Sequence, residues 1–315
     1  MINLRNGFRQ IKIKSEIYKH FTEITMANLI LGTVQFGLDY GINNLYGKIE
    51  YNEVIKILDF AHSNNITILD TAPAYGESEA LLGKSICEIG KPYNIITKYP
   101  SNQPGYPVRW IDNSLKLLKV NSVYGYLFHS YSTFQEHPEY IDDFIQLKEC
   151  GKAEKIGFSL YYPSEAEFIV ANNVPCDIVQ VPYNIFDQRF ASVFPILKSK
   201  NIEIHVRSIF LQGLFFISLD NLDNHFISVK DNLKEIHKFA KAENLDISSI
   251  CFGFVNKNKY VDKIVMGIDS LKNLESNVIN FLAPNIKNID FSPLESLMVS
   301  DEKIILPINW NRKNI

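Results

Sequence analysis

The feature of this sequence that most restricts its fold is a repeated alternation of short apolar runs with stretches of helical spacing. Eight runs rich in Ile, Val and Leu each precede a segment in which apolar residues recur every three or four positions. This alternation is typical of βαβ units, which build parallel sheets. We predict strands at 29–36, 66–71, 93–99, 124–130, 155–160, 178–184, 202–208 and 263–268. We predict helices near 51–64, 77–88, 108–119, 139–150, 164–172, 189–200, 231–243 and 271–280.

The number and order of these units favour a closed barrel over an open sheet. An open sheet that binds a dinucleotide usually carries G-x-G-x-x-G after its first strand, but no two glycines in this chain are two positions apart. We therefore predict an α/β protein with a single-domain (β/α)8 (TIM) barrel over residues 28–290. Residues 1–27 are expected to form an N-terminal extension or a cap over the barrel bottom, and residues 291–315 a C-terminal tail.

Capping and turn residues support several predicted helix ends. Ser164 precedes Glu167 by three residues, the spacing of a capping box, and this predicts a helix start there. Gly151 and two Asn-Asn pairs, at 64–65 and 172–173, tolerate the left-handed conformation that ends many helices.

Composition excludes several classes of partner. A formal net charge of −3 provides no general attraction for phosphate backbones, so no nucleic-acid partner is expected. The longest apolar stretch, 209–219, is interrupted by Gln212 and Gly213 and is too short to cross a bilayer. Residues 1–27 have no continuous apolar segment of the kind found in secretory signals. We therefore expect a cytoplasmic protein that does not contact membranes.

Metal binding is not expected either. The four cysteines are widely scattered without C-x-x-C spacing, and the histidines show no H-x-H or H-E-x-x-H pairing. We expect the cysteines to be buried free thiols. They are Cys87, Cys150, Cys176 and Cys251.

Three polar residues close consecutive predicted strands, and a tyrosine follows the first of them. Asp70, Lys98 and His129 each end an apolar run, and Tyr75 lies in the loop after Asp70. Side chains alternate along a strand, so these three share the inward face with apolar residues two positions earlier. The carboxyl ends of barrel strands carry the active site in this fold. Singly, each residue has a structural explanation: an ion pair, a core histidine, a turn aromatic. Together they predict a catalytic group.

The chemistry of this group points to proton donation. A phenol has a pKa near 10, and an adjacent ammonium is expected to lower the pKa of Tyr75 by about 1–3 units. Asp70 would keep Lys98 protonated and in place, and His129 could hydrogen-bond a substrate carbonyl and orient it. We predict that Tyr75 acts as a general acid beside a carbonyl group.

Five segments of the chain resemble the aldo/keto reductase family, in the same order and at its spacing. The segments are Leu31–Gly37, Leu69–Glu79, Ile96–Lys98, Leu127–His129 and Gly151–Ser159. The resemblance runs from about residue 28 to residue 310 and is most specific at D-T-A-x-x-Y-G. It implies a catalytic tetrad of Asp70, Tyr75, Lys98 and His129, and a nicotinamide cofactor held without a Rossmann turn. It also implies reduction of an aldehyde or ketone by hydride transfer, with Tyr75 supplying the proton.

The resemblance also implies a set of cofactor contacts. Ser159 and Gln180 match positions that bind the nicotinamide amide, and the segment 267–277 matches the clamp on the adenosine end. Two positions depart from the family: Leu160 stands where an asparagine is common, and Arg207 where an aromatic usually stacks on the nicotinamide. A guanidinium can stack in place of a ring. The expected cofactor contacts are Gly32, Thr33, Ser159, Gln180, Arg207, Ser208, Gly213, Gly267, Ser270, Lys272, Asn273 and Asn277.

The choice between NADP(H) and NAD(H) depends on the charges near the 2′ position. Lys272 is the one basic residue in that segment and Asp269 repels a phosphate, so selectivity should be weaker than usual. We expect NADP(H), following the family, with NAD(H) as the alternative.

Aromatic residues in the predicted strand-to-helix loops suggest a rim for a flat or sugar-like substrate; the alternative is that many of them pack the loops. A small carbonyl compound, such as a sugar or sugar derivative, is the expected partner. Two other functions stay open: a cofactor-binding regulatory protein without turnover, and a lyase or isomerase that uses Lys98 as a Schiff-base amine. The predicted rim residues are Phe36, Tyr40, Tyr99, Tyr131 and Tyr161, with Tyr162 and Phe186 beside them.

Overall fold

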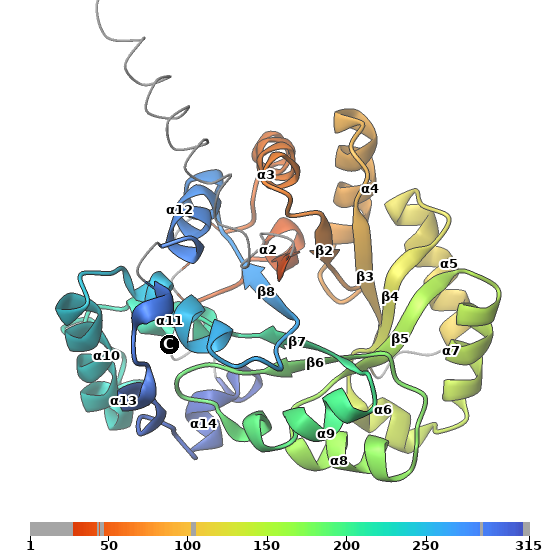
Figure 1. Cartoon of the computed structure of the whole chain (residues 1–315). Helices are drawn as coiled ribbons and strands as arrows, with labels where there is room; N and C mark the ends of the chain where they lie inside the picture. The colour runs from red at the N-terminus through yellow and green to blue at the C-terminus, as the bar shows by residue number, and fades with distance from the viewer. Residues whose placement is uncertain (1–27, 43, 45–46, 102–104, 284–285, 311–315) are drawn as a thin grey trace, which may run out of the picture.

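A computed structural model describes residues 28–42, 44, 47–101, 105–283 and 286–310. Eight parallel strands form a closed barrel in chain order, because β1 pairs with both β2 and β8 (Figure 1). The predicted α/β class and (β/α)8 barrel are therefore confirmed. The strands are β1 (Leu29–Gly32), β2 (Ile68–Asp70), β3 (Asn94–Tyr99), β4 (Val123–Phe128), β5 (Ala153–Ser159), β6 (Ile178–Pro182), β7 (Glu203–Arg207) and β8 (Lys263–Gly267).

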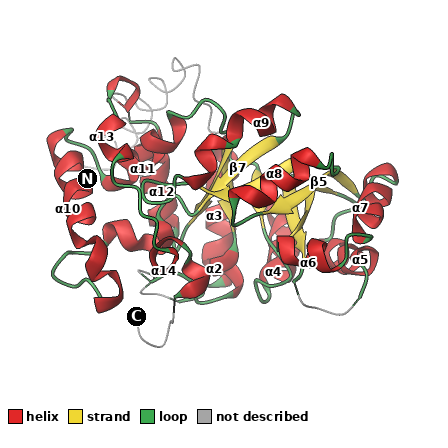
Figure 2. Cartoon of the chain, turned by 90° about the horizontal axis from the view of Figure 1, so that it is seen from below, coloured by secondary structure: helices red, strands yellow, loops and turns green. Residues whose placement is uncertain are grey.

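Helices surround the barrel in the order of the chain (Figure 1, Figure 2). The longer ones are α3 (Tyr51–Ser63), α4 (Ser78–Ile89), α5 (Pro107–Leu118), α7 (Tyr140–Glu149), α8 (Pro163–Ala171), α10 (Lys230–Ala242), α11 (Ile247–Asn256) and α12 (Leu271–Phe281). Short helices include α2 (Val34–Gly37), α6 (Tyr131–Glu136), α9 (Phe194–Ser199), α13 (Ser292–Glu295) and α14 (Glu302–Ile305). All eight predicted helical regions contain helix, and α2, α6, α11, α13 and α14 were not predicted.

The apolar core has two parts, as expected for a barrel with helices outside it. A large cluster fills the space between strands and helices. A small cluster fills the barrel interior, and it contains Ile68, Ile96 and Leu127, which lie two residues before Asp70, Lys98 and His129 respectively. The predicted inward apolar columns therefore lie beneath these three polar residues.

Several predicted boundaries were wrong. The first strand ends at Gly32, and α2 occupies the rest of the predicted strand. The helix expected at 189–200 is divided by Val193 into a 3-10 turn at Arg189–Ser192 and α9, which has proline in its first turn. The capping box of α8 uses Glu165 instead of Glu167: the Glu165 carboxylate accepts from the backbone N–H groups of residues 161 and 162. The cap therefore lies two residues earlier than predicted.

The predicted left-handed turn positions are present, but not all of the cysteines are buried as predicted. Asn65, Gly151 and Asn173 have φ values of 60°, 77° and 49°, which confirms the predicted left-handed positions. Cys251 is buried as expected and Cys176 is half-buried, but Cys87, on α4, and Cys150, directly after α7, are exposed. All four are free thiols.

The segment after the barrel packs against it. Trp310 is buried, its indole N–H donates to the carbonyl of Ile304, and its ring contacts Phe226. Helices α13 and α14 lie on the same side of the barrel as α10 (Figure 1, Figure 2). The domain limits at residues 28, 290 and 291 remain our proposal. The predicted extension at 1–27 and the last residues of the tail, 311–315, lie outside the described residues.

Candidate active site

The barrel brings together the polar residues that end β2, β3 and β4. Asp70 is the last residue of β2, Lys98 lies next to the end of β3, and His129 follows β4 directly. The register pairs Asp70 with Ile96 and Lys98 with Leu127, so both side chains point to the interior at the same rim.

Three oxygen atoms at this end of the barrel accept hydrogen bonds from the Lys98 ammonium. Its Nζ atom lies 2.8 Å from both carboxylate oxygens of Asp70 and 2.9 Å from the carbonyl oxygen of Thr71. The Oη atom of Tyr75 lies 3.4 Å from the same Nζ atom. Lys98 is 1% exposed and Asp70 3%, so water hydrates neither charge. Each charge therefore depends on the other for its stabilisation. The amide Nε2 of Gln180 also donates to Asp70, at 2.8 Å.

Tight packing of two loops places Tyr75 above this ion pair. The residue lies in a turn, with its backbone N–H donating to the carbonyl of Ala72. Gly37 allows the neighbouring loop to approach, because a Cβ atom there would lie 1.8 Å from the carbonyl oxygen of Tyr75. Gly76 has a φ of 60°, a value that glycine adopts without strain. A side chain at either glycine would therefore disturb the turn that carries Tyr75.

The pKa of Tyr75 moves in the opposite direction to our prediction. Burial and the negative charge of Asp70 raise it well above its usual value, and only the charge of Arg207 opposes them. The predicted lowering by Lys98 was wrong because burial disfavours the phenolate and because Asp70, which lies closer to Lys98, neutralises that ammonium. Tyr75 therefore stays protonated, the state that a proton donor requires.

His129 is neutral and lies beside Tyr75. The two rings meet edge to face, with centroids 5.8 Å apart. Burial, and then the positive charges of Lys98 and Arg207, lower the pKa of His129 to about 3. A neutral imidazole can donate one N–H to a carbonyl oxygen without a charge of its own.

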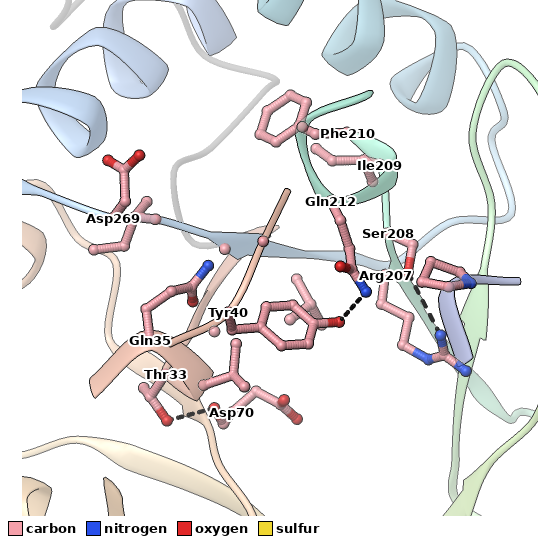
Figure 3. Close-up of a pocket in the computed structure, with 18 of the residues that line it drawn as sticks. Thr33, Gln35, Tyr40, Asp70, Arg207, Ser208, Ile209, Phe210, Gln212 and Asp269 are labelled. Carbon is pink, nitrogen blue, oxygen red and sulfur yellow. Dashed lines mark hydrogen bonds between the residues drawn. The ribbon is translucent and has the colours of Figure 1, made fainter. Parts of the chain in front are cut away.

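These residues open into a cavity of about 440 Å³, a volume typical of small-molecule sites. Figure 3 shows Asp269 at one end of this cavity and Arg207 at the other. Most of the predicted cofactor residues line it: Gly32, Thr33, Ser159, Gln180, Arg207, Ser208, Gly213, Gly267, Asn273 and Asn277. Asp70, Tyr75 and His129 line it too, and Lys98 lies behind Asp70 and Tyr75.

Other predicted residues lie elsewhere. Ser270 caps α12 and Lys272 is exposed, and neither lines the cavity. Of the aromatic rim, only Tyr40 and Tyr161 line it. The others pack against core residues or face solvent outside the cavity: Phe36, Tyr99, Tyr131 and Phe186 are buried in the core and Tyr162 is exposed.

The loop after β7 crosses the mouth of the cavity in a strained conformation. Ser208, Leu211 and Gln212 have φ values of 60°, 46° and 52°, which side chains other than glycine rarely adopt. Gln212 donates from Nε2 to the Oη atom of Tyr40 at 2.9 Å, and its carbonyl accepts from the backbone N–H of Ile42 (Figure 3). The sequence analysis missed Gln212, because no local pattern predicts a contact between residues 172 positions apart.

Arg207 faces the cavity beside this loop. Its Nη2 atom donates to the carbonyl of Leu160 at 3.1 Å, and its guanidinium lies 4.4 Å from the ring centroid of Tyr161. The Nε atom is buried and has no hydrogen-bond partner among the described residues. The sequence suggested that the guanidinium of Arg207 could stack on the nicotinamide ring. In the structure it stacks on the ring of Tyr161.

The cavity fits a polar ligand such as a nicotinamide cofactor. The Oε1 atoms of Gln35 and Gln212 line it, are buried, and have no partner among the described residues. Such acceptors usually have a donor to bind, and an extended ligand would supply one. Gly32 also lines the cavity, and it lets β1 pack closely on β8, because a Cβ atom there would lie 3.3 Å from the carbonyl oxygen of Met266.

The described part of the chain contains neither a candidate membrane span nor a candidate metal site. No helix in these ranges is long and apolar enough to cross a membrane. No group of three or more His, Cys, Asp or Glu side chains within the same ranges could hold a metal ion.

These features define a (β/α)8-barrel protein with a small-molecule cavity at the carboxyl ends of its strands. The chain belongs to the aldo/keto reductase family, whose sequence profile matches residues 28–298. Membership makes it an oxidoreductase of small carbonyl compounds, in a family that generally uses nicotinamide cofactors. The resemblance found in the sequence is thereby confirmed.

Relatives and solved structures agree with this assignment. The chain is 28% identical over 227 residues to the aldo-keto reductase YhdN of Bacillus subtilis, which covers 65% of this chain and 67% of that protein. It is 25% identical over 275 residues to the L-galactose dehydrogenase of Arabidopsis thaliana, covering 79% and 84% of the two chains. The fold matches a holo-form aldo-keto reductase from Bacillus halodurans with a TM-score of 0.69, at 19% identity over 87% of this chain and 93% of that one.

Proposed function

We propose that this protein reduces an aldehyde or ketone to the alcohol with a reduced nicotinamide cofactor, and that Tyr75 supplies the proton. The observation that carries the proposal is the 3.4 Å separation of Tyr75 Oη and Lys98 Nζ in a cavity that His129, Ser159 and Gln180 also line. In the balanced reaction, the carbonyl carbon gains a hydride, the oxygen gains a proton, and the cofactor is oxidised. The cofactor, when bound, supplies that hydride.

The residues of the chain position the carbonyl and protonate its oxygen. His129 donates an N–H to the carbonyl oxygen and Tyr75 transfers its phenolic proton to the same atom. Lys98 then stabilises the phenolate that forms, at short range and away from water. Asp70 acts through Lys98, which it holds in place. Ser159 and the carbonyl group of Gln180 would bind the nicotinamide amide, because Nε2 of Gln180 is already bound to Asp70.

The charges at the far end of the cavity support NAD(H) over the NADP(H) expected from the sequence. The carboxylate of Asp269 lines the cavity and would repel a 2′-phosphate, whereas it could accept a hydrogen bond from a ribose hydroxyl. Lys272, the basic residue expected to bind that phosphate, does not line the cavity. We therefore propose NAD(H) as the preferred cofactor.

The lining favours a polar, hydroxylated carbonyl compound such as a sugar or sugar derivative. Tyr40 and Tyr161 supply flat faces with hydroxyl groups, and Gln35 supplies an amide oxygen that has no partner among the described residues. The Schiff-base alternative is less well supported, because the Lys98 ammonium donates to Asp70 and Thr71 and is not free to attack a carbonyl.

Tyr75→Phe tests the proposal. We expect it to abolish oxidation of NADH by sugar aldehydes and ketones, while NADH binding stays within a few fold of wild type. Tyr126→Phe is the matched control, since it removes a buried phenol hydroxyl outside the cavity and should keep its activity. NADH binding without turnover of any carbonyl compound would instead identify a regulatory protein. A borohydride-trapped adduct on Lys98 would identify the Schiff-base chemistry.

A further inference from the structure

Arg207 brings an uncompensated positive charge to one end of the cavity. The side chain is partly buried, and it forms no ion pair with a carboxylate of the described residues. Its partners are the carbonyl of Leu160, the hydroxyl of Ser208 at 3.5 Å and the ring of Tyr161. All of these are neutral, so they orient the guanidinium without cancelling its charge.

This charge lies near the reacting centre. The charge of Arg207 adds to the effect of burial in lowering the pKa values of Lys98 and His129, and it opposes the rise in the pKa of Tyr75, so its field reaches all three. The residue that accepts its hydrogen bond, Leu160, directly follows Ser159. Ser159 in turn pairs in register with Gln180. Arg207 therefore lies beside the two residues proposed to hold the nicotinamide amide.

We infer that Arg207 makes this protein bind the reduced nicotinamide cofactor more tightly than the oxidised one. The inference rests on the proposed function. The two forms share their adenosine, ribose and phosphate groups, so any difference in affinity arises at the ring. The oxidised ring carries one positive charge and the reduced ring carries none. Two like charges repel at short range in a partly buried site, and the reduced form avoids this penalty.

Other charged groups near Arg207 weaken this repulsion only in part. Glu165 interacts electrostatically with Arg207, but its carboxylate already accepts from the backbone N–H groups of Tyr161 and Tyr162 and caps α8. Asp70 is paired with Lys98, so the pair is neutral overall. The guanidinium therefore dominates the electrostatics at this end of the cavity.

The consequence is a bias toward reduction during cofactor exchange. The oxidised product leaves easily, and the site reloads with reduced cofactor even when the oxidised form is abundant. The overall equilibrium between carbonyl and alcohol is unchanged, because a catalyst cannot alter it. The binding preference sets which form occupies the site.

Equilibrium titrations of the full chain test this inference without using activity. We would measure the Kd of NADH by its fluorescence and that of NAD⁺ by calorimetry. The ratio Kd(NAD⁺)/Kd(NADH) should exceed 10 in the wild type. In Arg207→Gln and Arg207→Met, which remove the charge, the ratio should fall by about tenfold. Arg207→Lys, which keeps a charge, should retain most of it.

Glu165→Gln supplies a variant expected to change the ratio in the opposite direction. It keeps an acceptor for the cap of α8 but removes the negative charge near Arg207, so the ratio should rise. An unchanged ratio in both neutral variants that still bind the two forms would overturn the inference and leave the proposed function intact. If the ratio fell as far in Arg207→Lys as in the neutral variants, the inference would also be overturned, since the shape of the guanidinium would then matter more than its charge. Failure of the wild type to bind either form would overturn the proposed function itself.

Discussion

Lys98 lies closer to Asp70 than to Tyr75: its Nζ atom is 2.8 Å from both carboxylate oxygens and 3.4 Å from the phenol oxygen. Burial and the charge of Asp70 keep Tyr75 protonated, because the ammonium is largely neutralised by its closer partner. In the reaction that we propose, the ammonium acts when the proton leaves, because the new phenolate then competes with Asp70 for it. The ion pair would thus hold a cation at the site without lowering the pKa of the phenol in advance.

Asp70→Asn should damage both stability and activity. The substitution leaves a buried ammonium without an anionic partner, so we expect the free energy of unfolding to fall by about 3–5 kcal/mol. Carbonyl reduction should fall more than tenfold because Lys98 loses its position or its proton. Chemical denaturation and NADH oxidation measure the two effects.

The double variant Asp70→Asn with Lys98→Met is the control for that experiment. It removes both charges, so it should recover part of the lost stability and none of the activity. A double variant as unstable as Asp70→Asn alone would mean that the buried charge is not the cause.

The pH dependence of the protein should reflect a neutral His129. Its pKa is about 3 in the folded protein and about 6.5 when unfolded, so below pH 6.5 the unfolded chain binds more protons than the folded one. Stability should therefore decline as the pH falls from about 6.5 toward 3, and His129→Gln should reduce that decline. Thermal unfolding of both proteins across this range measures the difference. An identical decline in both would contradict the lowered pKa.

The kinetics of carbonyl reduction give a second test of the protonation state of His129. Because His129 is already neutral, kcat/KM for a carbonyl substrate should show no break near pH 6.5. A loss of activity below pH 6.5 that disappears in His129→Gln would show that the imidazole gains a proton in the working enzyme.

The positions of the proposed catalytic residues could be predicted because they follow from local rules. Asp70, Lys98 and His129 each close an apolar run, and alternation along a strand fixes the face on which each side chain lies. A closed parallel barrel then brings those ends to one rim. Tyr75 required the motif around it, since nothing in a loop tells a catalytic tyrosine from a turn aromatic.

The lining of the cavity could be predicted only in part, because it depends on packing between distant segments. Phe36 was placed on an extended strand, but it lies in the short helix α2 and its ring enters the core. Tyr99 points away from the cavity because the interior face of β3 is taken by Ile96 and Lys98. Its hydroxyl donates to the carbonyl of Gly105. The contact between Gln212 and Tyr40 joins loops at opposite ends of the barrel sequence. No local periodicity encodes such a contact.

Tyr40→Phe should loosen the loop that crosses the cavity. It removes the 2.9 Å hydrogen bond from Gln212 and leaves the backbone bond between Ile42 and the carbonyl of Gln212. We expect NADH to dissociate several times faster in stopped-flow experiments, with about 0.5–1.5 kcal/mol lost from the free energy of unfolding. Adding Gln212→Ala should increase the rate little further, because both changes remove the same bond. Fully additive effects would show that the bond does not restrain the loop.

Asp269→Asn should shift cofactor preference, because Asp269 is the carboxylate at the end of the cavity opposite Arg207. A 2′-phosphate adds close to two negative charges, so removing the carboxylate relieves a direct repulsion. We expect the Kd of NADPH to fall about tenfold and the Kd of NADH to stay level or rise, since a ribose hydroxyl loses a strong acceptor. Lys272→Gln is the matched control: its charge is exposed and outside the cavity, so the ratio of the two Kd values should change by less than about twofold. A wild-type protein that binds NADPH more tightly than NADH, and loses that preference in Lys272→Gln, would show that the lysine reaches the phosphate and that Asp269 does not decide the choice.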